Sequence, residues 1–208
     1  MNKYLDCLYH IVDDLKKLPY IEITLNEIAE GTSYDYVHDY LIDNGWRASE
    51  AYINFCSSID FADIEWEVKE SFINILSLET SMCTTGKIGI PLFEDVLAQD
   101  FWLNKIWDEF NTERGIKINS RLILIDYFEP DISGCICIEA TDKIIGSELS
   151  YFNHQTGIRP FDISFKEYFH KLRGSRGIYG WQQALFSNDT EYREQVDFAL
   201  KKLFTKQL

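Results

Sequence analysis

Apolar residues recur every three or four positions in several stretches of the chain, which is the spacing of an amphipathic helix. The stretch 3–18 has this spacing, and Pro19 is expected to end the helix. A second helix is predicted over 33–43, where Asn44 and Gly45 suit a C-terminal cap. Further helices are predicted over 49–56, 93–114 and from 188 to 203.

A different pattern, with a period of two or a short apolar run, predicts strands. Residues 64–68 alternate apolar and acidic side chains, as in a strand with one wet face. Apolar runs between turn residues predict three more strands at 122–125, 134–139 and 147–154. Within 134–139, Cys135 and Cys137 share one face of the strand and Ile136 and Ile138 the other, so both faces are apolar. We therefore expect an interior strand with cover on both sides.

The segment from Ser164 to Phe169 carries two independent signals for the start of a helix. Ser164 and Glu167 stand at the spacing of a capping box, and Ile163 and Tyr168 at that of a hydrophobic staple. With the preceding strands and helices, this predicts an α+β protein. We expect a mainly antiparallel, strongly twisted sheet of five or six strands with helices packed on it.

The order of elements from Leu122 to Phe169 resembles the SUKH superfamily. That order is a strand, an acidic loop, a strand with Gly and Cys, a strand followed by a His-containing turn, and a helix opened by Ser-Phe-x-Glu. The spacing of Tyr52 and Phe55 also matches the family, although Arg47-Ala48 stands where the family has Leu-Pro. The resemblance covers residues 45–175. It makes 1–44 an N-terminal helical addition and 176–208 a C-terminal turn and helix packed on the core.

The resemblance implies a binding protein without a catalytic centre or cofactor, because many members are bacterial immunity proteins that neutralise toxins. The expected partner is a basic toxin domain, of the nuclease type, covered directly at its active site. Two alternatives stay open. One is an intracellular regulator or scaffold, like the yeast glucan-synthesis regulators of the same superfamily. The other is an enzyme, whose marker would be a pocket that gathers His154 or His170 with Cys or carboxylate groups.

Charge is distributed unevenly along the chain of 208 residues, whose formal net charge is −14. Residues 1–100 carry 6 Lys and Arg against 19 Asp and Glu, whereas residues 101–208 carry 14 against 15. An acidic surface of this kind either keeps the protein soluble or attracts a basic partner. Direct binding to nucleic acid is not expected, because the phosphate backbone requires a basic stripe.

Composition indicates a cytoplasmic protein with a single folded core. The first residues lack the apolar core of a secretory signal, and no apolar run reaches the roughly 20 residues of a membrane helix. The five cysteines, an odd number, are expected to be reduced thiols. Cys135-x-Cys137 lacks a second pair of ligands for zinc, and the glycine-rich turn 174–180 lacks the spacing of a phosphate-binding loop. No metal or cofactor site is predicted.

The predicted partner-binding surface joins the acidic strand near residue 65 to the loop that follows Ile125. Loops and strand ends on a rigid sheet are common places for recognition, and aromatic residues commonly anchor interfaces. The alternative is that these are scattered solvated acids around ordinary core aromatics. The candidate residues are Asp60, Asp63, Glu65, Trp66, Glu67, Asp126, Tyr127, Phe128, Glu129 and Asp131.

Overall fold

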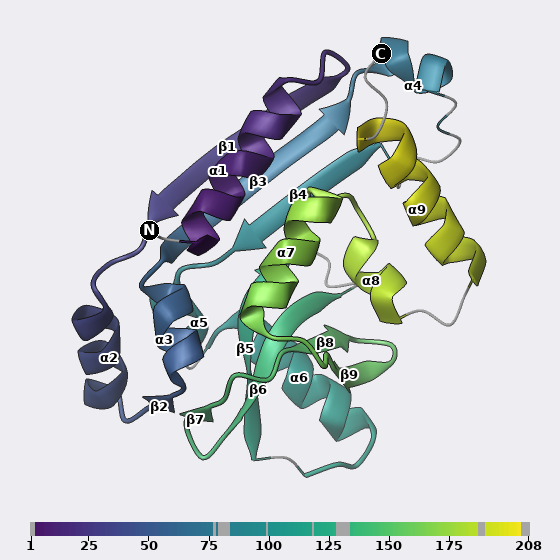
Figure 1. The fold of residues 1–208 in the computed structure, drawn as a ribbon. Helices are drawn as coiled ribbons and strands as arrows, with labels where there is room; N and C mark the ends of the chain where they lie inside the picture. Colours follow the sequence, from purple (N-terminus) through teal and green to yellow (C-terminus); the bar gives the residue numbers. More distant parts are fainter. Residues whose placement is uncertain are drawn as a thin grey trace.

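The computed structural model describes residues 3–76, 78, 84–98, 100–117, 119–127, 134–186 and 190–204, and it belongs to the α+β class (Figure 1). The helices are α1 (Lys3–Lys16), α2 (Tyr34–Asp43), α3 (Glu50–Cys56), α4 (Glu70–Leu76), α5 (Phe93–Leu97), α6 (Trp102–Glu113), α7 (Phe165–Ser175), α8 (Trp181–Phe186) and α9 (Thr190–Phe204). The strands are β1 (Ile21–Glu30), β2 (Arg47–Ala48), β3 (Ile59–Val68), β4 (Thr85–Ile90), β5 (Ser120–Tyr127), β6 (Cys135–Thr141), β7 (Ile144–Ile145), β8 (Ser150–Asn153) and β9 (Gly157–Pro160).

All these strands form one curled sheet in the order β1-β3-β4-β5-β6-β7-β2, and β8 joins β6 and β9 off this path. Every pair is antiparallel except β2 with β7, which is parallel, so the sheet is mixed. The prediction of five or six strands was too low, since the described residues form nine. Strands of two to four residues, such as β2, β7 and β9, are too short to produce a period that can be recognised in the sequence.

The N-terminal segment 1–44, expected to be helical, contains the long edge strand β1 between its two helices. β1 pairs with β3 from Ile21 opposite Val68 to Glu30 opposite Ile59. Helix α1 packs on β1 and α7, and its buried residues belong to the same core cluster as those of the remaining elements. The helical description of 1–44 therefore needs correction, because this segment supplies one edge of the sheet.

The helix predicted over 93–114 is two helices, so the prediction of one continuous helix was wrong. Ala98 and Phe101 have extended ψ angles of 143° and 131°, which end α5 and precede α6. The carbonyl of Ala98 accepts a hydrogen bond of 2.7 Å from Nη2 of Arg121 on β5. A side chain of the sheet thus binds a backbone group at the break between the two helices.

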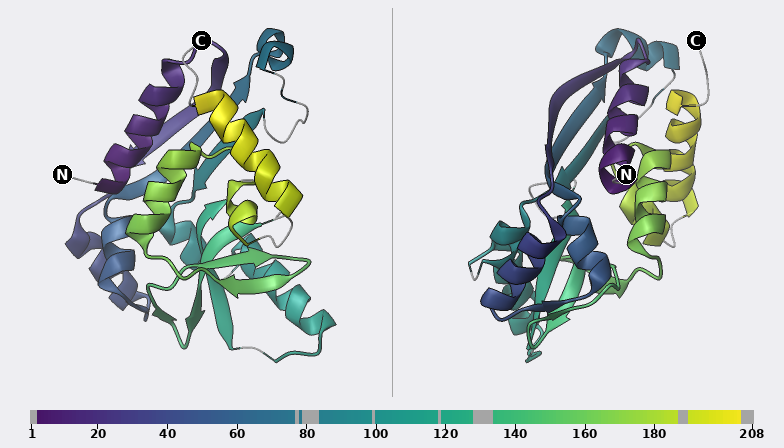
Figure 2. Two further views of the ribbon diagram at one scale, coloured as in Figure 1. Left: turned by 45° about the vertical axis from the view of Figure 1, so that its right-hand side comes forward. Right: turned by 60° about the vertical axis from the view of Figure 1, so that its left-hand side comes forward.

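Helices α1, α7 and α9 lie on one side of the sheet formed by β1, β3 and β4, as the two views of Figure 2 show. The predicted start of α7 is confirmed, because Ser164 Oγ accepts from the amide of Glu167 and Glu167 Oε2 accepts from the amide of Ser164. The predicted interior strand is also confirmed in β6, where Cys135, Ile136 and Cys137 are at most 1% exposed. The helical layer leaves the opposite side of β1, β3 and β4 for the site described next.

Candidate functional site: an acidic sheet face

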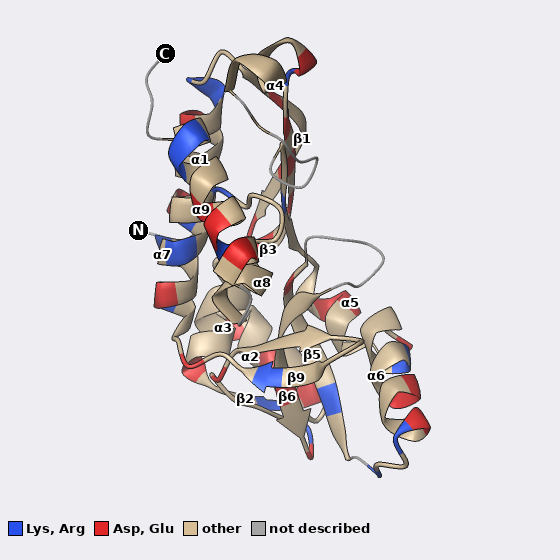
Figure 3. Ribbon diagram, turned by 90° about the vertical axis from the view of Figure 1, so that its right-hand side faces the viewer, with Lys and Arg blue, Asp and Glu red and all other residues tan. Residues whose placement is uncertain are grey.

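Asp and Glu residues are frequent along β1 and β3 (Figure 3, red), and strand pairing gathers five of them on the side of the sheet that faces away from α1, α7 and α9. Alternation along β3 produces this arrangement, since even-numbered residues from Ala62 to Val68 are buried and the residues between them are half-buried or exposed. Cross-strand pairing then places Glu27 opposite Asp63, and Leu25 and Lys87 on either side of Glu65. We call this surface the acidic sheet face: Glu22, Leu25, Glu27, Asp63, Glu65, Glu67 and Lys87.

Lys87 is the one cation of this surface, which otherwise carries five carboxylates. Its Nζ donates to Glu65 Oε1 at 2.5 Å and lies 3.4 Å from Asp63 Oδ1, a contact that lacks the geometry of a hydrogen bond. Burial lowers the pKa of Lys87, but the hydrogen bond to Glu65 and the charges of Asp63 and Glu65 outweigh it and leave the pKa raised. A half-buried ammonium thus ties β4 to β3, and the excess of negative charge faces outward.

Tyr127 lies at the border of the acidic sheet face, with the centroid of its ring 5.3 Å from Nζ of Lys87. It pairs with Gly89 on β4, and a Cβ atom at Gly89 would come within 2.7 Å of the tyrosine ring. The glycine therefore makes room for an aromatic side chain in this place. Burial raises the pKa of the Tyr127 phenol further above neutral pH, and the neutral hydroxyl can donate a hydrogen bond.

The structure brings together some of the predicted partner-binding residues and separates others. Asp63, Glu65 and Glu67 share the acidic sheet face, and Tyr127 borders it. Asp60 lies near the start of β3, at the register shift between the pairs Ala29–Phe61 and Glu30–Ile59, so it is not part of the regular alternation that forms the acidic sheet face. The pKa of Asp60 is raised by burial and by the nearby charge of Glu94. Phe128, Glu129 and Asp131 lie outside the described residues.

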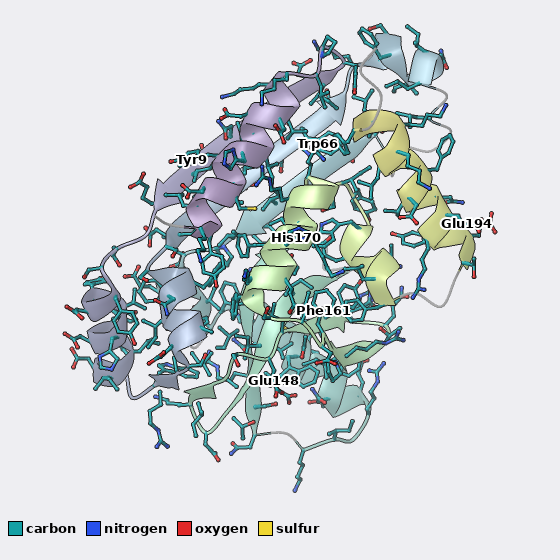
Figure 4. All side chains as sticks on the ribbon, in the orientation of Figure 1. Tyr9, Trp66, Glu148, Phe161, His170 and Glu194 are labelled. Atoms are coloured by element: carbon teal, nitrogen blue, oxygen red, sulfur yellow. The ribbon has the colours of Figure 1, made fainter. Side chains whose placement is uncertain are left out.

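Trp66 is not an exposed anchor, so the prediction that it contacts a partner was wrong. Its side chain is 1% exposed and points into the core on the helical side of the sheet (Figure 4). Its Nε1 donates to the carbonyl of Arg176 at 2.8 Å, and its ring meets that of Phe204 edge to face. The alternation that exposes Glu65 and Glu67 places the residue between them inside.

Asp126 is likewise a core residue, 1% exposed, and its predicted place on a binding surface was wrong. Its Oδ1 accepts from the amide of Gly89, and its Oδ2 accepts from the hydroxyl of Tyr168 and from Nε2 of Gln182. Burial raises the pKa of Asp126 to about 7, although these hydrogen bonds lower it. The prediction placed Asp126 in the loop after Ile125, whereas β5 continues to Tyr127 and has a register shift between Leu124 and Asp126.

The marker of the enzyme alternative is present in part, because His170 and Cys7 line the same groove between α1 and α7. The thiol of Cys7 donates to the carbonyl of Phe169 at 3.3 Å. Burial raises its pKa to about 11, although Arg173 lowers it, so the reactive thiolate is disfavoured. A nucleophilic thiol requires the opposite shift, so the burial of Cys7 works against this role.

Among the described residues, no group of three or more His, Cys, Asp and Glu side chains is placed to hold a metal ion. Within that same part of the chain, no helix has both the length and the apolar character needed to cross a membrane. Comparisons with models of known families, with curated proteins and with solved structures find no match for this chain.

Proposed function

We propose that this protein binds a basic protein partner through the acidic sheet face, and that the partner is a toxin domain that it neutralises. The observation that carries the proposal is the concentration of five carboxylates against one ammonium on a sheet surface that none of α1, α7 and α9 covers. A rigid sheet presents these charges in fixed positions, which favours fast and selective capture of a positively charged surface. The resemblance to SUKH immunity proteins supports the same class of function.

A nuclease-type toxin is the partner whose surface fits this charge best. An enzyme that acts on nucleic acid must attract phosphate groups, so its active-site cleft is basic. An inhibitor that covers this cleft gains from carboxylates that replace the phosphates. Leu25 and Tyr127 add partly buried apolar area to the acidic sheet face and its border, which a purely electrostatic surface would lack.

The first experiment asks whether the neighbouring upstream gene encodes a protein with a toxin-like C-terminal domain, and co-expresses such a domain with this protein. We expect growth to be rescued by the wild-type protein, and the purified pair to associate with a rate that falls steeply as salt increases. The variant Glu27→Lys/Glu67→Lys reverses two exposed charges of the acidic sheet face that make no ion pair within the described structure. Its association rate at low salt should be about tenfold lower.

The matched control is Glu109→Lys/Glu194→Lys, which makes the same change in net charge at exposed positions on α6 and α9. The control should keep an association rate within about twofold of the wild type, because screening confines steering to charges near the interface. An equal loss of association rate in both variants would show that the rate depends on the net charge of the protein and not on the acidic sheet face. The absence of any toxin-like neighbour, or full rescue by the Glu27→Lys/Glu67→Lys variant with an unchanged rate, would remove the proposal.

A further inference from the structure

The groove between α1 and α7 differs in charge from the rest of this acidic protein. It encloses about 580 Å³, and its floor includes the rings of Tyr4 and Phe169, whose centroids lie 4.9 Å apart. This volume is within the range of sites that hold a small ligand or a few residues of a peptide. The groove opens on the helical side of the molecule, where Figure 4 shows His170 on α7.

Basic side chains surround this aromatic floor. Lys166, His170 and Arg173 follow one another on α7 at intervals of four and three residues, which places them along one side of the helix. Lys3, in the first turn of α1, joins Lys166 and Arg173 as the third Lys or Arg side chain of the groove. We call these residues together with Tyr4 and Phe169 the basic groove. No Asp or Glu of the described chain lines it.

The three cations of the basic groove form no ion pair within the described part of the protein, although the charge of Lys166 helps to lower the pKa of the neighbouring Glu167. Every ion pair found there belongs to other side chains, and Lys3, Lys166 and Arg173 are all exposed. Three unpaired cations in one groove are unexpected in a chain with a formal net charge of −14. Their charge is available to a ligand that brings carboxylates of its own.

We propose that the basic groove binds an acidic peptide segment that carries an aromatic side chain between its carboxylates. The aromatic ring packs on Tyr4 and Phe169, and the flanking carboxylates pair with Lys3, Lys166 and Arg173. A nucleic acid is a poorer occupant, because the acidic surface around the groove repels a long polyanion, whereas a short segment meets only the local cations. The basic groove and the acidic sheet face lie on opposite sides of the sheet, so this binding is separate from that of the proposed toxin partner.

The test uses the full chain and a short fluorescein-labelled peptide of Glu and Asp residues around one Phe, followed by fluorescence anisotropy. Two matched peptides replace the Phe by Gly or the acids by Gln. We expect saturable binding of the first peptide that weakens with salt. Each matched peptide should bind about tenfold more weakly, since each loses contacts worth about 1.4 kcal/mol.

The variant Lys166→Glu/Arg173→Glu should reduce the affinity for the acidic peptide at least about tenfold, because two attractive contacts become repulsive. The control Lys105→Glu/Lys117→Glu makes the same charge change at exposed sites on and after α6 and should stay within about twofold. The milder Lys166→Gln/Arg173→Gln variant repeats the test if the double reversal unfolds the protein. Failure of the wild type to bind, equal losses in both double variants, or equal binding of the Phe-free peptide would overturn the proposal.

Discussion

The acidic sheet face and the basic groove are two surfaces of opposite charge built from one acidic chain. On β3, a period of two places Asp63, Glu65 and Glu67 on the side away from the helices. On α7, a period of 3.6 gathers Lys166, His170 and Arg173 beside α1. The net charge therefore does not describe either surface. Regular secondary structure sorts the charges, and each surface has to be tested by itself.

The largest expected change in the free energy of unfolding comes from comparing a buried residue of β3 with an exposed one. Trp66→Ala should lower the free energy of unfolding by about 3–5 kcal/mol, because it opens a cavity beneath α9 and leaves the carbonyl of Arg176 without its donor. The adjacent Glu67→Ala should change it by less than about 0.5 kcal/mol, since that side chain is solvated. Urea unfolding of both variants measures this. Comparable losses would contradict the assignment of the two sides.

The buried carboxyl group of Asp126 joins the sheet to α7 through Tyr168, and so connects the two surfaces through the core. Its pKa in the unfolded chain is near 3.8, whereas burial raises its pKa in the folded protein to about 7. The folded state therefore holds a proton that the unfolded state has lost between these two pH values. The stability from this group is fully present below pH 3.8 and is lost as pH rises to about 7.

Asp126→Asn removes this titration, because it replaces the carboxyl group by an amide of similar shape that does not ionise. The free energy of unfolding of the wild type should fall relative to that of the variant by on the order of 3 kcal/mol between pH 4 and pH 7, with little further change above. Urea unfolding at several pH values measures the difference, and Asp108→Asn, at an exposed position, is the control. Parallel pH profiles for wild type and Asp126→Asn would show that Asp126 is not protonated in the fold.

The smallest effect concerns the helix that carries the basic groove. Ser164→Ala removes the cap of α7 and should lower the free energy of unfolding by about 1 kcal/mol, without changing binding at the acidic sheet face. Ser147→Ala, at an exposed serine outside any helix, should be close to neutral. Thermal unfolding compares the two. A melting temperature for Ser164→Ala equal to that of the wild type would mean that the capping box does not stabilise the fold.

Sequence reasoning succeeded where a local signal is strong. Helix α7 begins after the predicted serine cap, α2 and α3 lie within the predicted helical stretches, and β5 and β6 coincide with the two apolar runs. It missed β1 although Ile21, Ile23 and Leu25 alternate with polar residues, because the stretch lies between two stronger helical patterns. It also joined α5 to α6, since periodicity continues across residues 98–101 while the backbone does not.

The candidate site was predicted in part for a similar reason. The alternation of 64–68 correctly indicated that Glu65 and Glu67 lie on a wet face, and that same alternation could have shown that Trp66 is buried. Lys87 could not be found from its neighbours in the sequence, because its carboxylate partners belong to another strand. The basic groove required two helices separated by nearly the whole chain, α1 and α7, to pack together.

By itself the sequence determined the α+β class, the capped helices and the faces of the strands, because caps, periods and turns act over a few neighbouring residues. The tertiary structure alone decided which carboxyl group is buried and which cations meet across a groove. Asp126 is buried near the end of a strand whose preceding four residues are also buried, and the packing of α1 on α7 places Lys3 and Lys166 on one groove. Burial and long-range proximity depend on the whole chain, and together they determine the sign and the magnitude of the charge on each surface.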